Sequence, residues 1–188
     1  EVSRNNIMSF EVYHEFIGIK GKGKLGDLDN DGDNDILLAG IKENGDYHTE
    51  IYWNDLNSFS SSQSGLVTLG QKNSIDFGDY DQDGDIDLFL LGGYSPVSSY
   101  YQVARIYNND LGTFTNINAG LTALSNGSGK WADYDNDGDL DLIMSGWNRN
   151  DRGTLYTKVY ENTSTGFHEE VHSISGLNYT VISLSDYD

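Results

Sequence analysis

The chain has 188 residues, of which 37% are hydrophobic and 12% aromatic, so it is long and apolar enough to form a globular domain with a core. Its formal net charge of −19 excludes nucleic-acid binding through a basic surface. It has no cysteine, which excludes disulfides and thiolate metal sites, and no apolar run near the roughly 20 residues of a membrane-spanning helix, which excludes membrane insertion.

The negative charge is concentrated in short segments. Of the 30 acidic residues, 17 lie in the segments 27–35, 79–87 and 133–141 and in the pair Asp186 and Asp188. The other 13 nearly balance the 11 Lys and Arg residues. The acidity is therefore a property of local sites and not of the whole surface.

These acidic segments mark an internal repeat. Their first Asp stands at positions 27, 79, 133 and 186, which gives steps of 52, 54 and 53 residues. A Tyr after a β-branched residue, a Phe seven residues later and then a Gly-Leu pair keep the same spacing, as at Tyr52, Phe59 and Gly65-Leu66. A fixed period of this length indicates a repeat architecture with a unit of about fifty residues.

Each unit reads as four short strands. In the first unit, a strand enters the acidic segment through Leu25-Gly26, and a mostly apolar strand leaves it at 36–39. A third strand follows around 51–53, after an Asn44-Gly45 pair typical of a tight hairpin, and a fourth lies near Phe59. No segment has sustained helical periodicity, so the predicted fold class is all-β.

Four antiparallel strands repeated every fifty residues favour the blades of a β-propeller, because stacked blades bury faces that a single sheet would leave exposed. A β-solenoid is the competing architecture, but its coils are usually shorter. We expect a fragment of about three to three and a half four-stranded blades. The expected division is the end of a preceding blade (1–21), three repeats (22–74, 75–128 and 129–181) and the start of a truncated fourth repeat (182–188).

The acidic segments have the composition of metal-binding loops. Five carboxylates within nine residues repel one another strongly unless a cation lies among them, and a set of oxygen ligands favours Ca²⁺ over Mg²⁺. A Gly at loop position 6 allows a sharp turn, while positions 1, 3, 5 and 9 offer side-chain oxygens and position 7 a carbonyl. We expect three Ca²⁺ sites, and a metal-free Asp-rich turn would not repeat the same five positions three times. The predicted metal residues are Asp27, Asp29, Asp31, Asp33, Asp35, Asp79, Asp81, Asp83, Asp85, Asp87, Asp133, Asp135, Asp137, Asp139 and Asp141.

An EF-hand is the nearest alternative for such a loop. It requires an acidic residue at position 12 and flanking helices. Position 12 is Leu38, Leu90 or Met144, each inside an apolar segment typical of a strand. The EF-hand is therefore rejected.

The motif Asp-x-Asp-x-Asp-Gly-Asp-x-Asp between two strands, entered through Phe-Gly or a similar pair and followed by Tyr-x-Asn, resembles the FG-GAP or VCBS repeat family. The loop is similar to the calcium loops of integrin α-subunit propellers. The resemblance covers nearly the whole chain and implies calcium-stabilised propeller blades of a secreted or cell-surface protein. The Gly-Ala-Pro segment of the family name is absent, and the role of the carboxylates at position 7 (Asp33, Asp85 and Asp139) is open.

Two function classes follow. The first is a non-enzymatic extracellular module for adhesion or for binding a protein or glycan. The second is a segment of a secreted polysaccharide-acting enzyme, similar to some lyases. The enzyme would need Lys, Arg, His or Tyr clustered at the ring centre or upper face, and the sequence shows no such cluster, so we expect no catalytic residues in this chain.

Loops at the end opposite the metal loops could hold a partner. Aromatic residues with Arg on loops are plausible anchors, although the simpler interpretation is that they pack locally on the blades. The residues concerned are Tyr47, His48, Tyr94, Tyr100, Tyr101, Trp147, Arg149 and Arg152. Because the array resembles part of a longer one, with Phe10 to Gly18 resembling the last strand of a preceding unit, we also expect open blade edges through which two copies could associate.

Overall fold

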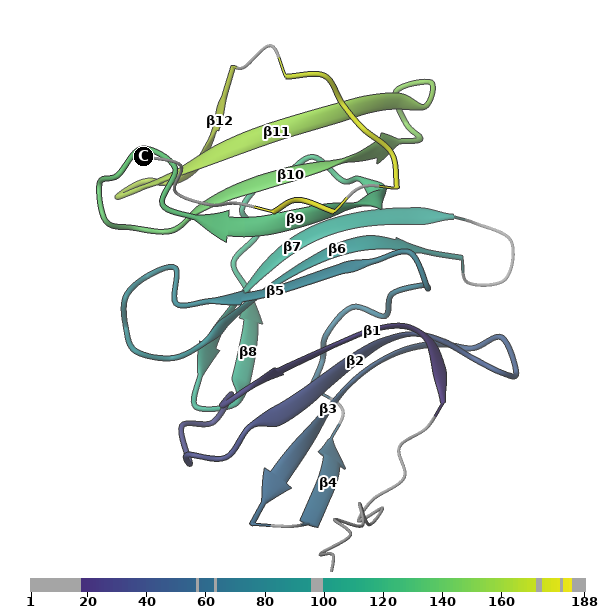
Figure 1. The fold of residues 1–188 in the computed structure, drawn as a ribbon, viewed down its shortest axis with the longest axis vertical. Coiled ribbons are helices and arrows are strands. Elements are labelled where there is room, and N and C mark those ends of the chain that lie inside the picture. The colour runs from purple at the N-terminus through teal and green to yellow at the C-terminus, as the bar shows by residue number, and fades with distance from the viewer. Residues whose placement is uncertain are drawn as a thin grey trace, which may run out of the picture.

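The computed structural model describes residues 18–56, 58–62, 64–95, 100–171, 174–179 and 181–183. These residues form three four-stranded antiparallel sheets (Figure 1). Within these ranges there is no helix, and hence none long and apolar enough to cross a membrane. The all-β prediction is confirmed.

Each sheet is built from four consecutive strands. The first contains β1 (Ile19–Gly26), β2 (Asp35–Lys42), β3 (Tyr47–Asp55) and β4 (Ser58–Ser62). The second contains β5 (Ser74–Gly78), β6 (Asp87–Tyr94), β7 (Tyr101–Asp110) and β8 (Thr113–Asn116). The third contains β9 (Ser125–Ala132), β10 (Asp141–Asn148), β11 (Thr154–Thr163) and β12 (Gly166–Glu170).

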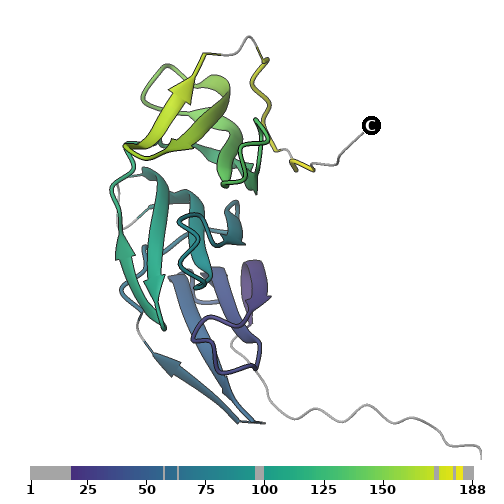
Figure 2. The same ribbon diagram turned by 90° about the vertical axis from the view of Figure 1, so that its left-hand side faces the viewer.

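The strands follow one another in space as they do in the chain, which is the up-and-down order of propeller blades. The first strands of neighbouring sheets, β1, β5 and β9, contact one another. Figure 2 shows the three sheets stacked face to face, with these first strands along one edge and β4, β8 and β12 along the other. The sheets are therefore consistent with a fragment of a propeller, with the first strands on the inner edge.

The hydrophobic core lies between the blades. The side chains Leu88 and Leu90 pack with blade 1 residues such as Leu37, whereas the alternate side chains Phe89 and Leu91 pack with blade 3 residues such as Met144. All four β6 residues are at most 1% exposed. Successive side chains of a strand point to opposite faces, so the unbroken apolar run at 88–91 fits a strand covered on both sides.

The Tyr and Gly-Leu landmarks of the repeat meet at the junctions between blades. The hydroxyl of Tyr107 accepts a hydrogen bond from Val67 N at 3.0 Å, directly after the Gly65-Leu66 pair. The hydroxyl of Tyr160 does the same with Thr122 N at 2.9 Å, after Gly120 and Leu121. Each Tyr thus fastens the segment that leads from the preceding blade into its own.

The first strands begin at Ile19, Ser74 and Ser125, near the expected repeat starts at 22, 75 and 129. Most of the expected preceding strand (10–17) and the expected fourth loop with Asp186 and Asp188 lie outside the described residues. The predicted Asn44-Gly45 hairpin is present, with Gly45 N donating to Lys42 O at 3.0 Å.

Candidate functional site

The three acidic loops connect the first strand of each blade to the second. They lie along one side of the stack, while the connections from second to third strands lie along the other (Figure 1). Because the three sheets have the same strand order, the loops repeat in the same place on every blade. Position 12 of each loop lies inside β2, β6 or β10, as expected for a loop that is not an EF-hand.

Two left-handed residues give each loop its turn. The Gly at position 6 has φ of 95°, 97° and 100° in Gly32, Gly84 and Gly138. Position 4 is also left-handed, with φ near 60° in Asn30, Gln82 and Asn136. This backbone region is unfavourable for most side chains and open to Gly, which explains the invariant position of Gly in the three loops.

The loops bring the carboxylates at positions 1, 3 and 9 together. In each loop one oxygen from each of these three residues lies within 4.8 Å of the others. The carboxylates at positions 5 and 7 are outside these groups. The groups are Asp27, Asp29 and Asp35; Asp79, Asp81 and Asp87; and Asp133, Asp135 and Asp141.

The carboxylate at position 9 is the buried member of each group. Asp35, Asp87 and Asp141 are all 0% exposed. One oxygen of Asp87 accepts from Tyr80 N at 3.0 Å and the other from Asn109 N at 2.9 Å, and the other two loops have the same pair of bonds. Position 9 therefore ties its own loop to the third strand of the same blade.

The carboxylates at positions 1 and 5 accept hydrogen bonds from the loop backbone. In the second loop, Asp79 accepts from the backbone N of Asp83 and of Gly84, both at 3.1 Å. The carboxylate of Asp83 then accepts from Asp85 N at 2.9 Å. The first loop has the same bonds, so the backbone N–H groups already point toward the acidic cluster.

Position 7 has a role that sequence reasoning left open. The carboxylate of Asp33 accepts from Leu56 N at 3.2 Å, and that of Asp85 accepts from Leu111 N at 3.0 Å. Leu56 and Leu111 are the left-handed residues of the turns from third to fourth strand, each with φ of 46°. In the first two loops, the position 7 carboxylates thus hold these turns against the loops.

The electrostatics of the loops favour a bound cation. The pKa of Asp87 is raised to about 7, mainly by burial and also by the nearby charges of Asp81 and Asp83. Hydrogen bonds from backbone N–H groups act in the opposite direction. In the third loop, burial and the neighbouring Asp137 raise the pKa of Asp139 to about 6. Carboxylates whose charged form is this costly, with only hard oxygen donors around them, fit a divalent ion such as Ca²⁺.

Residues 27–90 match the family model described as an FG-GAP-like repeat. The chain carries an FG-GAP-like repeat. The matched segment runs from the first Asp of loop 1 through loop 2 into β6, and the third blade has the same strand order and the same acidic group. This confirms the predicted resemblance. A search of curated proteins finds no match.

Neighbouring acidic loops are joined by amide side chains whose contacts were not predicted from the sequence. The position 4 side chain of Asn30 donates to the carboxylate of Asp85 in the next loop, and that of Gln82 donates to Gly138 O at 2.9 Å. From the other direction, Asn162 Nδ2 donates to Tyr80 O at 2.8 Å. The signal for Asn162 was present in the sequence, because it is the Asn of Tyr-x-Asn, but the repeat alone does not show what it contacts.

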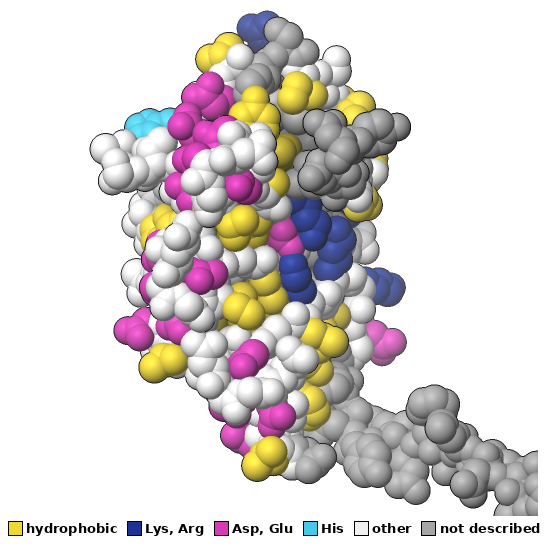
Figure 3. Space-filling model, turned by 60° about the vertical axis from the view of Figure 1, so that its left-hand side comes forward, with side chains coloured by type: hydrophobic (Ala, Val, Ile, Leu, Met, Phe, Trp, Pro, Cys, Tyr) yellow, Lys and Arg dark blue, Asp and Glu magenta, His cyan; other side chains and the backbone are white. Residues whose placement is uncertain are grey.

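A partly buried ion cluster joins the blades at their inner edge. The carboxylate of Asp76, on β5, forms ion pairs with Lys24 of β1 and with Lys130 Nζ of β9, the latter at 2.8 Å. It also accepts a hydrogen bond from Trp131 N at 3.0 Å. Burial alone would raise the pKa of Asp76, but these donors outweigh it and hold the pKa below its usual value. Figure 3 shows one compact patch of Lys and Arg side chains, whereas acidic side chains are spread over the neighbouring surface.

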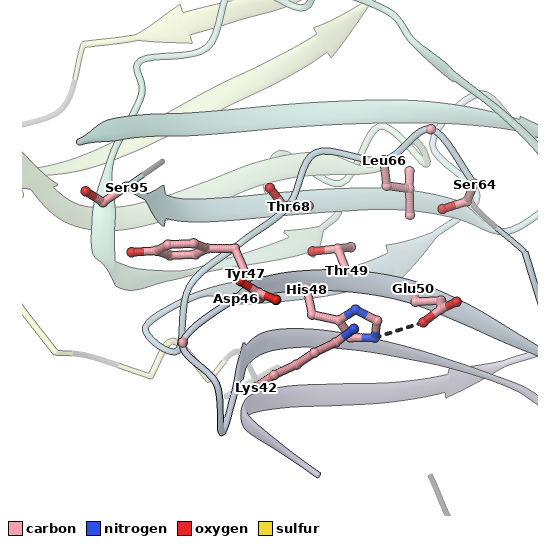
Figure 4. Close-up of a pocket in the computed structure, with 12 residues that line it drawn as sticks. Lys42, Asp46, Tyr47, His48, Thr49, Glu50, Ser64, Leu66, Thr68 and Ser95 are labelled. Carbon is pink, nitrogen blue, oxygen red and sulfur yellow. Dashed lines mark ion pairs between the residues drawn. The ribbon is translucent and has the colours of Figure 1, made fainter. Parts of the chain in front are cut away.

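The end opposite the loops contains several cavities, two of which are lined by residues predicted to bind a partner. The larger of these two, of about 690 Å³, lies over β3 and includes Lys42, Tyr47 and His48, whose Nε2 lies 2.9 Å from a carboxylate oxygen of Glu50 (Figure 4). Burial and Lys42 lower the pKa of His48, against the opposite effect of Glu50. The second cavity, of about 380 Å³, is lined by Tyr47, Tyr100, Trp147 and Arg149 among others. Several of the predicted partner-binding residues therefore line cavities, and they also pack on one another.

Proposed function

We propose that this chain is a calcium-binding β-propeller module of a secreted or cell-surface protein, in which Ca²⁺ stabilises each blade and the propeller binds a protein or glycan. The observation that carries the proposal is the recurrence of one group of three carboxylates in the same place on all three blades. FG-GAP repeats are typically extracellular and non-enzymatic, which supports both the location and the class of function.

In each blade, the carboxylates at positions 1, 3 and 9 would hold the ion, with position 5 and the position 7 carbonyl completing its oxygen ligands. A Ca²⁺ ion neutralises the mutual repulsion of the loop carboxylates. Because position 9 also binds the third strand through Asn54 N, Asn109 N or Asn162 N, neutralising its neighbours stabilises a contact within the blade. The ion thereby contributes to the stability of the folded chain.

The proposal is tested by thermal unfolding in CaCl₂ and in EGTA. An ion that binds only the folded state stabilises it by about 2.7 kcal/mol per site when its concentration is 100 times Kd. We expect a higher Tm in calcium, three ions per chain by calorimetric titration and a smaller effect of Mg²⁺. An identical melting curve in EGTA would exclude the structural role of calcium.

A segment of a secreted polysaccharide-acting enzyme is the second candidate. It is favoured by the basic cluster at the inner edge, where Lys24 and Lys130 lie close to the same carboxylate. Such an enzyme needs a cluster of this kind. Both ammonium groups are paired with Asp76, however, so they neutralise a buried carboxylate. We therefore prefer the binding module, and an assay for unsaturated sugar products distinguishes the two.

Self-association through blade edges remains a further proposal. Blade 2 packs against both other blades, whereas blades 1 and 3 each pack against one in the described part of the chain, and such open edges of the array can associate with another copy. Light scattering at high protein concentration tests it, because a monomeric mass there would contradict it.

A further inference from the structure

The 380 Å³ cavity lies at the end of the molecule opposite the calcium loops. It is lined by residues of all three blades, including Ile41 at the end of β2, Tyr100 before β7 and Trp147 near the end of β10. Lys72 and Asn126, close to the starts of β5 and β9, also line it. Since the first strands form the inner edge, the cavity opens where the blades converge. Its volume is within the range of small-ligand sites.

The aromatic walls of this cavity are fixed in place. The ring centroids of Tyr100 and Trp147 lie 6.5 Å apart, with an angle of 50° between the ring planes. Tyr47 packs edge-on against Tyr94, with 6.4 Å between the ring centroids. Gln102 joins blade 2 to blade 3, since its Nε2 donates to Trp147 O at 2.6 Å and its Oε1 accepts from Arg149 N at 2.6 Å. The rings therefore present flat apolar surfaces at little cost in conformational entropy.

The charged groups of the cavity are both positive. Lys72 and Arg149 line it, and its described lining contains no acidic side chain. Arg149 lies 5.5 Å from the centre of the Tyr100 ring, and Lys72 Nζ donates to Tyr179 OH at 3.0 Å. In the described part of the chain, neither cation forms an ion pair with a carboxylate. In a chain with 30 acidic and 11 basic residues, this is a local reversal of charge that favours an anionic ligand.

We propose that this cavity binds a carboxylated saccharide. The apolar C–H face of a sugar ring packs on the rings of Tyr100 and Trp147, and its carboxylate lies between Lys72 and Arg149. Gln71 and Asn126, which also line the cavity, offer amide groups to sugar hydroxyls. A neutral sugar leaves the two cations without a negatively charged partner, and an inorganic anion leaves the aromatic surfaces uncovered.

This inference rests on the proposed function as an extracellular binding module and names its ligand class and site. The binding site and the calcium loops lie at opposite ends of the blades, so the two can be tested separately. Ligand binding is measured by calorimetry in CaCl₂, and the calcium dependence of Tm is measured without saccharide.

The test uses oligouronates and the same oligosaccharides with their carboxyl groups reduced to alcohols. We expect the oligouronates to bind at least tenfold more tightly than the reduced forms, with an affinity that falls as salt rises. Arg149→Gln and Trp147→Phe should each weaken oligouronate binding about tenfold. Arg152→Gln is the matched control, because Arg152 is a nearby exposed cation outside the lining of the cavity.

Equal affinity for the oligouronates and their reduced forms would overturn the proposal. An equal loss of oligouronate affinity in the Arg149 and Arg152 variants would overturn it as well. Binding of an acidic peptide but of no saccharide would assign the cavity to another class of ligand. Failure of oligouronate binding with an intact calcium effect on Tm would refute this inference alone. A missing calcium effect would refute the structural role of calcium.

Discussion

Asn109 Nδ2 donates a hydrogen bond to the carbonyl oxygen of Leu28, 81 residues earlier in the chain, at 2.8 Å. The same amide donates to Ile86 O at 3.0 Å, inside the acidic loop of its own blade. One buried side chain therefore joins two neighbouring loops. Asn162 repeats the contact one blade later through Tyr80 O. The loops are thus parts of one hydrogen-bonded row along the blade stack.

Replacing Asn109 by Ala should lower the free energy of unfolding by about 1–3 kcal/mol, because one buried and one partly buried carbonyl group lose their donor. Asn109 is 0% exposed, so water cannot easily replace its amide. Asn54→Ala is the matched control, since Asn54 Nδ2 donates only to Asn34 O of its own blade, at 3.3 Å and in an exposed position. Urea unfolding should show a clearly larger loss for Asn109. Equal losses would mean that the contact between blades adds nothing.

Replacing Asp76 by Asn should cost about 1–3 kcal/mol at neutral pH, since it removes charged hydrogen bonds from Lys24 and Lys130. The pKa of Asp76 is lowered below the ordinary value of 3.8 in the folded chain. Its stabilising effect is therefore present above pH 3.8 and is lost as the pH falls through the lower folded-state pKa. The stability difference between the natural chain and Asp76→Asn should narrow below about pH 4.

A double-mutant cycle with Lys24→Gln controls for effects of the Asp76 substitution that do not involve the ion pair. We expect the two losses to be less than additive, because either change breaks the same contact. Full additivity, or a stability gap that stays constant from pH 7 to pH 3, would contradict the role of this ion cluster.

The strand order and the acidic loops were predictable because they depend on features that every repeat shares. The ion cluster was not, although Lys24, Asp76 and Lys130 each stand three residues before the first Asp of their loop. It depends on a difference between repeats, Lys in two and Asp in one, together with the contact of β1, β5 and β9 at the inner edge. A search for shared residues does not detect complementary charges at equivalent positions.

The role of the position 7 carboxylates could not be predicted from the sequence for a second reason. Asp85 is in the acidic loop, yet its carboxylate holds the turn at Leu111. The repeat shows an acidic residue at this position in every loop. It does not show whether the carboxylate contacts the metal-binding loop or the neighbouring turn. Only the return of the chain from β7 to β8 brings the turn within hydrogen-bond distance.

Asp85 and Asp81 should therefore respond differently to calcium. Asp85→Ala should destabilise the chain by about 1 kcal/mol in both CaCl₂ and EGTA, because the bond to Leu111 N does not involve the metal. Asp81→Ala should reduce stability mainly in CaCl₂, since Asp81 belongs to the group of three carboxylates. Parallel thermal melts of the two variants check this. A loss for Asp85→Ala that disappears in EGTA would instead make its carboxylate a calcium ligand.

Gly129→Ala should be strongly destabilising, by about 1–3 kcal/mol, because it overfills the core between blades 2 and 3. A Cβ atom at Gly129 would lie 2.2 Å from Cε1 of Phe89, whose side chain is 0% exposed. The ring of Phe89 also packs edge-on against Trp131 at 6.1 Å, so it has little room to move away. Urea unfolding in CaCl₂ measures the loss.

Gly18→Ala is the control for the change in backbone entropy, because a Cβ there would meet no atom within 4 Å. Ala loses less backbone entropy than Gly on folding, both in β9 and just before β1, so a loss seen only at Gly129 must come from the contact with Phe89. Combining Gly129→Ala with Phe89→Leu should then recover part of the lost stability, since the smaller side chain makes room for the new methyl group. If Gly129→Ala left the stability unchanged, or if Phe89→Leu only added to the loss of stability, the explanation would be wrong. The close approach of β9 to β6 would then not be the reason for Gly at this position.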